Sequence, residues 1–453
     1  MVRTRFAPSP TGLLHVGGLR TALFNFLFAK NQGGQFILRI EDTDQKRFLE
    51  GATENLIKTL QDFRLFPDEG PDLNSKFGPY IQSERLGIYK KYSEQLLAED
   101  KAYYEESEAG RAVRFKMKKT GVSQMEDLVR GELRFNNDLQ KDPILLKSDG
   151  FPVYNFANVI DDYSMEITHV IRGEEFLSSA PIYAQLYEAF GWQKPKFVHL
   201  PLILDRERKK LSKRAGDVAV EQYVKKGYLK EALLNFIALL GWNPKTTREI
   251  FGLEDLIEEF SLEKVNKSGA IFDITKLDFI NREWQKKLQI PLQDDRLFAR
   301  ACELLKERLG ENFSRPLFEL IWPQVLERIA GPSDLEEKLP EFYFYFALPG
   351  YSADLLIWKN TSKEKIKSNL QLLRDWLQQA SLAKYDAKRL EEKIKATLAE
   401  RGVGTGEALW PLRVSLSGQK NSPSPFEIIA VFAQFEETEI FSRLDRAIDK
   451  LSA

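Results

Sequence analysis

The sequence predicts an α/β fold, a doubly wound parallel sheet with an insertion, followed by an α-helical half. A short strand at residues 3–7 leads through a glycine-containing turn into a helix, and an apolar strand follows at 36–40. Apolar runs return after residue 150, and helical patterns replace them after about Gly216. This order of strand, turn, helix and strand is typical of Rossmann-like domains that bind nucleotides.

The first helix is predicted to begin at Gly17-Gly18 and to end at Gly33-Gly34, because glycine is common where helices end. Apolar side chains recur at spacings of four, seven and eight along one face of this helix: Leu19, Leu23, Phe26 and Leu27. The strand at 36–40 is apolar enough to be buried within a parallel sheet.

Residues 83–148 interrupt this pattern and are predicted to form an insertion. Apolar runs at 153–160, 167–171 and 197–204 are assigned to the second half of the sheet. Helical faces then follow, for example Leu297, Ala301, Leu304 and Leu305, or Leu390, Ile394 and Leu398. The expected boundaries are 1–82 and 153–216 for the two halves of the α/β domain, 83–152 for the insertion, 217–285 for a following domain, and 286–453 for a helical region with a break near 350.

The composition excludes several classes of protein. With 43% hydrophobic and 29% charged residues, the chain can bury real cores and is not a disordered protein. The longest apolar stretch, 232–240, is far shorter than the about 20 residues of a membrane span. The N-terminal residues lack the apolar core of a secretory signal, so a cytoplasmic location is expected. The single cysteine, Cys302, excludes internal disulfides. With one cysteine and three histidines, no zinc or other protein-bound metal is expected.

The charge balance does not by itself point to a nucleic-acid partner. The formal net charge of the chain is −1. Residues 196–230, however, hold ten Lys or Arg against four Asp or Glu. A local basic segment of this kind suits contacts to phosphates, although from charge alone a solvated surface is the commoner explanation.

The first motif with chemical meaning lies at residues 8–18 and reads Pro-Ser-Pro-Thr-Gly-Leu-Leu-His-Val-Gly-Gly. Glycines at a strand-to-helix turn let the backbone and the helix N-terminus approach an anion closely. His15 at this turn is suited to donate a hydrogen bond to the charge that develops on a transferring phosphate. On its own, a histidine beside glycines is more often structural.

The second motif lies at residues 209–214 and reads Lys-Lys-Leu-Ser-Lys-Arg. Clustered cations beside a hydroxyl suit a pyrophosphate leaving group, because negative charge builds up on its oxygens. Standing alone, the segment would be an exposed basic turn. Together, the early His-x-Gly turn and the late Lys-x-Ser-Lys loop are the nucleotidyl-transfer pattern of class I aminoacyl-tRNA synthetases, and the pair is far more specific than either part.

Further blocks narrow the resemblance to bacterial-type glutamyl-tRNA synthetases. The N-terminal block at 5–12, followed by Arg-Ile-Glu-Asp-Thr-Asp at 39–44, looks like the start of that family. The blocks at 80–85, 154–162 and 171–175 are similar to it as well, and so are 272–277 in the stem-contact region and 410–418 in the C-terminal domain. The resemblance covers essentially the whole chain. It implies a glutamate–tRNA ligase that uses ATP with Mg²⁺ to form glutamyl-adenylate and then charges tRNA(Glu).

The resemblance also implies roles for individual residues. Glutamate would be bound by Arg5, Ala7, Ser9, Glu41, Tyr154, Asn158 and Arg172, with Arg5 on the side-chain carboxylate and Glu41 suited to the ammonium group. ATP would be surrounded by His15, Gly17, Glu175 and Ile203, and its phosphates held by Lys210, Ser212 and Lys213. Arg47 would lie near the tRNA acceptor end. Two fixed arginines agree with the chemistry, since arginine offers a bidentate fork to a carboxylate.

The same resemblance assigns tRNA contacts to the domains. The insertion at 83–152 would contact the acceptor end, 217–285 the stem and 286–453 the anticodon. The insertion looks shorter than in the family and lacks the cysteines that bind zinc in some members. Phe176, often Trp in the family, is either core packing or a neighbour of adenine.

Several alternatives remain to be distinguished. A glutaminyl-tRNA synthetase would have a β-barrel anticodon module, and a non-catalytic RNA-binding descendant would be expected to lose Lys213, His15 or Glu41. A small-molecule nucleotidyltransferase would not need the helical half. A monomer is expected, and the choice between tRNA(Glu) alone and tRNA(Glu) with tRNA(Gln) stays open.

Overall fold

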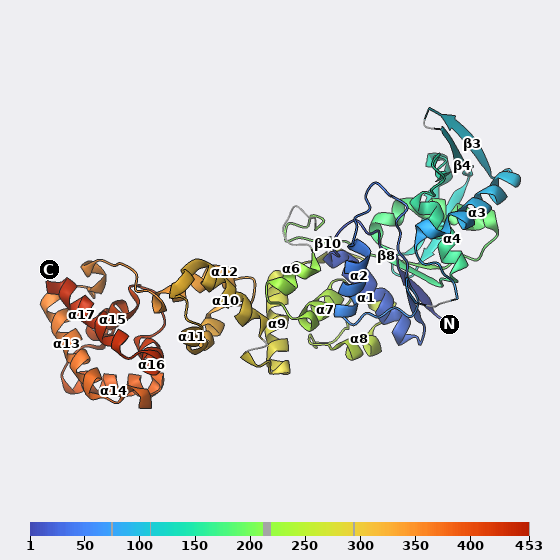
Figure 1. The fold of residues 1–453 in the computed structure, drawn as a ribbon. Helices are drawn as coiled ribbons and strands as arrows, with labels where there is room; N and C mark the ends of the chain where they lie inside the picture. The colour runs from blue at the N-terminus through green and yellow to red at the C-terminus, as the bar shows by residue number, and fades with distance from the viewer. Residues whose placement is uncertain (74–75, 109, 212–218, 293–294, 453) are drawn as a thin grey trace. The chain divides into compact units, whose positions relative to one another are not determined.

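The computed structural model describes residues 1–73, 76–108, 110–211, 219–292 and 295–452. The chain divides into two compact units, Met1–Gln289 and Ile290–Ala453. Each unit has its own secondary structure and its own packing (Figure 1). The finer boundaries expected from the sequence remain predictions.

The first unit is built on a six-stranded sheet with the order β2-β1-β8-β9-β5-β6. All neighbouring pairs except β5 and β6 are parallel. The carboxyl ends of β1, β8 and β9 therefore meet at one edge of the sheet, where α/β proteins bind ligands. The strands are β1 (Arg3–Phe6), β2 (Gln35–Leu38), β5 (Val122–Asp127), β6 (Gly131–Asn136), β8 (His169–Gly173) and β9 (Lys196–Leu200).

The predicted opening of the fold is confirmed. Helix α1 (Val16–Asn31) lies between β1 and β2, which pair in parallel from Arg3↔Gln35 to Phe6↔Leu38. Its predicted face is buried: Leu19, Leu23 and Leu27 are inaccessible to solvent and Phe26 nearly so. The helix ends just before Gly33, whose φ of 59° is in the left-handed region that glycine adopts without strain.

The assignment of residues 153–160 to the sheet is wrong, because this run forms helix α4 (Tyr154–Ser164). The assignment of 167–171 holds, since β8 lies there, and that of 197–204 holds in part, because β9 belongs to the main sheet whereas the short β10 (Ile203–Leu204) lies outside it. Helix α4 is buried from Phe156 to Asp162, and its polar side chains Asn158, Asp161 and Asp162 face buried arginines rather than solvent. A fully buried helix segment cannot be told from a buried strand by periodicity alone.

The segment expected to be an insertion contributes to two sheets. Strands β3 (Ala102–Ser107), β4 (Gly110–Phe115) and β7 (Ile144–Leu146) form an antiparallel sheet of three strands. The hairpin of β5 and β6 instead extends the main sheet, through the pairing of Asp127 with Phe197 on β9. Part of this segment is thus a structural extension of the α/β core.

Helices cover the main sheet and continue beyond it. The other helices of the first unit are α2 (Ala52–Asp62), α3 (Leu86–Ala98), α5 (Ala180–Phe190), α6 (Val220–Lys225), α7 (Lys230–Leu239), α8 (Leu253–Glu259) and α9 (Ile274–Leu288). The predicted fading of β structure after about Gly216 is confirmed for the described residues, with the short strand β11 (Ala270–Ile271), paired with β10, as the exception. None of the described helices is both long and apolar enough to cross a lipid bilayer.

The second unit is helical, as predicted. Its helices are α10 (Arg296–Leu309), α11 (Arg315–Arg328), α12 (Leu335–Lys338), α13 (Lys363–Gln379), α14 (Ala387–Glu400), α15 (Thr405–Ser417), α16 (Pro425–Phe435) and α17 (Thr438–Ser452). One hydrophobic core extends through these helices. Of the predicted faces, Leu297, Ala301 and Leu305 on α10 and all three residues on α14 are buried, while Leu304 is partly buried.

We predict that residues 290–453 fold cooperatively by themselves, because their core is made by residues of this unit alone. Leu370 on α13 is fully buried in that core, so Leu370→Ala should lower the free energy of unfolding by about 2–5 kcal/mol. Gln371→Ala, at the exposed neighbouring position, should change it by less than about 0.5 kcal/mol. Urea denaturation followed by circular dichroism measures both, and equal effects of the two substitutions would contradict the core described here.

Candidate active site

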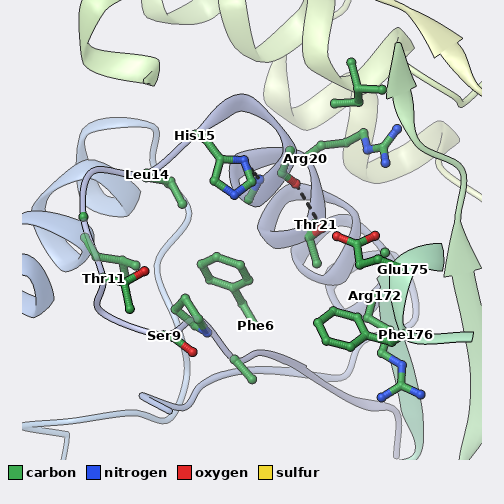
Figure 2. Close-up of a pocket in the computed structure, with 18 of the residues that line it drawn as sticks. Phe6, Ser9, Thr11, Leu14, His15, Arg20, Thr21, Arg172, Glu175 and Phe176 are labelled. Atoms are coloured by element: carbon green, nitrogen blue, oxygen red, sulfur yellow. Dashed lines mark hydrogen bonds between the residues drawn. The ribbon is translucent and has the colours of Figure 1, made fainter. Parts of the chain in front are cut away.

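A cavity of about 430 Å³ opens at the carboxyl edge of the main sheet. Its walls come from the end of β1, the turn into α1, the end of β8 and the segment around β10. Figure 2 shows His15 and Glu175 on different walls of this cavity, with Phe6 between the turn and the strand. Of the predicted site residues, those that line it are Arg5, Ala7, Ser9, His15, Gly17, Arg47, Tyr154, Arg172, Glu175, Ile203 and Lys210.

Four predicted residues do not line the cavity or cannot be placed. Glu41 and Asn158 are buried and lie outside its lining, connected to it through Arg5. Ser212 and Lys213 lie outside the described residues. Lys210, just before them, follows a turn in which Asp205 accepts a hydrogen bond from the backbone of Lys209, and it reaches the cavity.

His15 is positioned by its place at the N-terminus of α1. It is the N-cap residue, and its Nδ1 accepts a hydrogen bond from the backbone N–H of Gly18 at 3.1 Å. A neutral ring that accepts at Nδ1 carries its proton on Nε2. A Cβ at Gly17 would lie 3.1 Å from the His15 ring, so glycine there allows the turn to close tightly. The arrangement presents N–H groups to the cavity and suits an anion.

The opposite wall is formed where β8 ends. Gly173 is followed by a 3-10 helix, Glu174–Ser179, and the Glu175 carboxylate folds back over Gly173 so closely that any side chain at Gly173 would displace it. Phe176 lines the cavity and stacks on Tyr154 with 5.1 Å between ring centres. Of the two readings for Phe176, the structure favours a wall of the site over interior packing.

Arg172 is a buried cation with unused donors. Only 4% of its surface is exposed, and its guanidinium lies 4.2 Å from the centre of the Tyr183 ring. Its Nε donates to His199, whereas neither terminal nitrogen makes a hydrogen bond of normal geometry among the described residues. Buried donors normally find partners, so two such donors at a cavity wall are suited to bind a ligand. Two parallel donors of this kind match a carboxylate.

Arg5 is not a surface residue but part of a buried ionic network. Its Nε donates to Asp162 at 2.9 Å, and one terminal nitrogen donates to Asn158 at 3.2 Å. Arg39 donates to the same oxygen of Asp162 at 2.8 Å. Although burial works against the ionised form, Arg5 and Arg39 hold the pKa of Asp162 below its usual range. Arg5 therefore reaches the cavity from a rigid base.

Glu41 has one satisfied oxygen and one free oxygen. Its Oε1 accepts from Arg39 and from the amide of Asn158, at 3.0 and 2.8 Å, while Oε2 has no partner among the described residues. Burial raises the pKa of Glu41 to about 7, although Arg39 and Arg5 oppose the shift. Burial, together with the charge of Glu41, also raises the pKa of Tyr154 well above 10, so this carboxylate acts on the cavity wall.

Several residues of the site were not predicted from the sequence. Arg39 and Asp162 hold Arg5 and Glu41 in place, and Asp161 pairs with Arg85 at 2.7 Å beneath them. Arg20 on α1 lines the cavity and donates to the carbonyl of Leu240. Arg39, Asp161 and Asp162 could have been identified from the sequence, because charged residues within or beside apolar runs must be paired when those runs are buried.

The described residues contain no group of three or more His, Cys, Asp or Glu arranged to hold a metal ion. Cys302 lies in the second unit, half-buried, where burial raises the pKa of its thiol to about 11. This thiol is therefore protonated at neutral pH.

Comparison with known families gives two matches that together cover nearly the whole chain. The catalytic domain of class I tRNA synthetases (E and Q) matches residues 1–111 and 104–279. An anticodon binding domain matches residues 290–448. The break between these two matches coincides with the division into two structural units.

Individual proteins agree with the family matches. The chain is 40% identical to the glutamate–tRNA ligase of Lachnoclostridium phytofermentans over 499 aligned positions, covering 100% of this chain and 99% of that protein. It is 41% identical to the enzyme of the same name from Chlorobium phaeobacteroides, covering 99% and 98%.

Two solved structures have the same fold over 99% of both chains. One is the glutamate-tRNA synthetase of Elizabethkingia anophelis, with a TM-score of 0.83 and 33% identity. The other is a glutamate tRNA ligase from Elizabethkingia meningosepticum in complex with its amino acid, with a TM-score of 0.82 and 32% identity. With sequence, fold and cavity in agreement over its full length, the chain belongs to the glutamate–tRNA ligases, a family of class I aminoacyl-tRNA synthetases.

Proposed function

We propose that this chain activates L-glutamate with ATP and transfers it to the 3'-terminal adenosine of tRNA(Glu). The observation that carries the proposal is the cavity itself. In one space it combines a glycine turn at a helix N-terminus, suited to phosphates, with the two terminal guanidinium nitrogens of Arg172, suited to a carboxylate. An enzyme that joins an amino acid to a nucleotide needs both.

In this proposal glutamate is held through its three charges. Arg5 pairs with the side-chain carboxylate and Arg172 holds the other end of the substrate. Glu41 attracts the ammonium group, with Asn158 fixing the orientation of the Glu41 carboxylate. Ala7, Ser9 and Tyr154 complete the walls around the amino acid.

ATP is proposed to occupy the other part of the cavity. Gly17 and the N-terminus of α1 approach its phosphates, and Nε2 of His15 donates a hydrogen bond to them. Glu175 and Ile203 line the nucleoside end, and Lys210 with Ser212 and Lys213 holds the phosphates. ATP arrives with Mg²⁺, which neutralises part of the phosphate charge.

The chemistry balances without a protein nucleophile. An oxygen of the glutamate α-carboxylate forms a bond to the α-phosphorus, and the bond from that phosphorus to the pyrophosphate oxygen breaks. A ribose hydroxyl of the terminal adenosine then forms a bond to the acyl carbon, its proton is lost, and AMP leaves. The residues named here contribute positioning and charge stabilisation, which account for most of the acceleration in such transfers.

The tRNA is proposed to reach the cavity past Arg47, an exposed residue at its lining, while residues 290–453 bind the anticodon. We expect a cytoplasmic monomer that binds no zinc, since Cys302 is the one cysteine of the chain. Charging of tRNA(Gln) in addition to tRNA(Glu) is a second activity to test. Aminoacylation with radiolabelled glutamate against each purified tRNA measures the proposed function directly.

We predict that Arg172→Ala raises the KM for glutamate by at least one to two orders of magnitude while the KM for ATP changes little. Hydrogen bonds to charged groups contribute about 1.5–3 kcal/mol each, and the two free donors of Arg172 have no protein partner to lose. Arg172→Lys should recover only part of the loss, because an ammonium lacks the fork. Arg64→Ala, at an exposed ion pair, is the matched control. Normal glutamate binding by Arg172→Ala would contradict the proposed site.

Arg5→Ala should differ from Arg172→Ala in one respect. It should also raise the KM for glutamate, but it removes one of the two arginine partners of the buried Asp162 and should therefore lower the melting temperature as well. Thermal denaturation measured beside the aminoacylation kinetics separates the two effects. If Arg5→Ala left the melting temperature unchanged, the buried network would be misassigned.

Glu41 should make glutamate binding depend on pH. Its pKa is raised to about 7 by burial, so the carboxylate that attracts the ammonium group is lost as pH falls through about 7. kcat/KM for glutamate should therefore rise between about pH 6 and pH 8, and Glu41→Gln should abolish this limb. The pH dependence of folding stability has the opposite direction. Because the pKa of Glu41 is higher in the folded state, Glu41 stabilises the folded state below about pH 4.5, and this stabilisation is lost as pH rises through about 7. A limb that survives in Glu41→Gln would exclude Glu41 as its source.

Removing residues 290–453 should leave a folded first unit that binds ATP but charges tRNA poorly. The cavity is lined by residues of the first unit alone, whereas the proposed anticodon contacts lie in the second. ATP binding by calorimetry and aminoacylation of tRNA(Glu) test the two halves of this statement. Equal charging efficiency of the truncated and whole proteins would exclude an anticodon role for the helical unit.

A further inference from the structure

Arg172 is held by a histidine on the neighbouring strand. Strands β8 and β9 pair in parallel with Arg172 directly opposite His199. The Nε of Arg172 donates to Nε2 of His199 at 3.2 Å, and the ring of His199 is fully buried. The hydrogen bond uses the one guanidinium nitrogen that lies along the side chain, so both terminal nitrogens are left for the cavity.

His199 is in turn held by a carboxylate on the next strand. One oxygen of Asp127, at the end of β5, accepts from the backbone N–H of His199 at 2.9 Å and contacts Nδ1 of its ring at 2.7 Å. The other oxygen accepts from the backbone N–H groups of Val129 and Arg130, at 2.9 and 2.7 Å, in the turn between β5 and β6. Asp127 is therefore an ionised acceptor fixed on both sides.

This arrangement determines which ring nitrogen of His199 carries the proton. Since ionised Asp127 can only accept, Nδ1 of His199 carries the proton and Nε2 is left as the acceptor that Arg172 needs. Burial lowers the pKa of His199, although Asp127 opposes the shift, which keeps the ring neutral. Burial disfavours the ionised form of Asp127, but the hydrogen bonds from His199 and from the turn hold its pKa below the usual range.

We infer that Asp127 and His199 are positioning residues that aim the guanidinium of Arg172 at the substrate carboxylate, and thereby set the affinity for the amino acid. Neither residue touches the cavity, and both act through Arg172. The inference rests on the proposed function, in which Arg172 binds glutamate. It gives the β5–β6 hairpin, which lies in the segment expected to contact tRNA, a part in amino-acid binding.

The competing explanation is that the pair is a polar element of the core that only stabilises the sheet. A guanidinium between aromatic rings, 4.2 Å from Tyr183 and 5.3 Å from Phe176, can rotate about its long axis without losing those contacts. The hydrogen bond to His199 sets this rotation. A stabilising role alone would not distinguish glutamate from ATP, whereas a positioning role affects glutamate only.

Three substitutions test the inference in the full-length protein. His199→Asn keeps an amide near the Nδ1 position but cannot reach Arg172. His199→Gln places an acceptor near the Nε2 position. Asp127→Asn puts an amide N–H against either the histidine or the turn, and so disturbs the tautomer or its support. His169→Asn is the matched control, because His169 lies at the other end of β8, away from the cavity.

We expect His199→Asn and Asp127→Asn to raise the KM for glutamate roughly 10- to 100-fold, with the KM for ATP within about twofold of the parent. His199→Gln should recover most of the loss, and His169→Asn should change neither constant. In the Arg172→Ala background, His199→Asn should cause no further rise in the KM for glutamate, because both substitutions act through the same group.

The outcomes separate the inference from the proposed function. If Arg172→Ala itself left the KM for glutamate unchanged, the proposed role of Arg172 would fail. If Arg172→Ala raised the KM for glutamate while His199→Asn and Asp127→Asn did not, only the positioning role of His199 and Asp127 would be refuted. That role would also be refuted if His199→Asn raised the KM for glutamate and the KM for ATP alike, or if its effect were additive with that of Arg172→Ala. Melting temperatures of all variants show which of them are folded.

Discussion

The cavity rests on one carboxylate shared by two buried arginines. Asp162 accepts hydrogen bonds from Arg5 and from Arg39, at 2.9 and 2.8 Å, although all three side chains are almost inaccessible to solvent. Breaking such a buried pair by removing one partner costs about 3–5 kcal/mol. Arg5 on β1 and Arg39, directly after β2, can therefore be buried only if helix α4 brings Asp162 to the same edge of the sheet. This electrostatic requirement fixes the positions of the buried side chains beneath the cavity without any substrate.

Within the same network, the carboxylates of Asp162 and Glu41 differ in their tendency to ionise. Asp162 stays ionised because two arginines face it, whereas Glu41, nearby, has its pKa raised to about 7 by burial. Among the buried groups left unsatisfied are two of opposite sign at the proposed amino-acid site, namely one oxygen of Glu41 and both terminal nitrogens of Arg172. Buried polar groups without partners are rare in folded proteins and are concentrated at functional sites. An amino acid carries complementary charges of both signs, which is why this pattern suits such a substrate.

Sheet register extends this organisation beyond the cavity wall. Arg172, His199 and Asp127 come from β8, β9 and β5, which are neighbours in the sheet but distant in the chain. The β5–β6 hairpin belongs to the sheet that carries the site, while β3, β4 and β7 form a sheet of their own. The helical unit has a separate hydrophobic core. Substitutions in that core and at the cavity are thus expected to act on stability and on chemistry independently.

The order β1, α1 and β2 could be predicted from the amino-acid sequence, because the spacing of apolar residues and the positions of glycines reflect local conformation directly. The motif at 8–18, also visible in the sequence, supplies much of the cavity lining, because it follows the carboxyl end of β1, where α/β proteins bind ligands. The resemblance to a known family added the roles of individual residues, and the family itself is confirmed.

Which buried charges pair with one another depends on long-range packing and could not be predicted. Helix α4 was assigned to the sheet because a short, buried apolar run cannot be told from a buried strand by periodicity alone. The partners of Arg5 and Arg172 lie 157 and 27 residues away in the chain, at Asp162 and His199. Strand register and helix packing bring such groups together, and no local pattern encodes them. The sequence shows that these buried charges need partners, and long-range packing determines which residues those partners are.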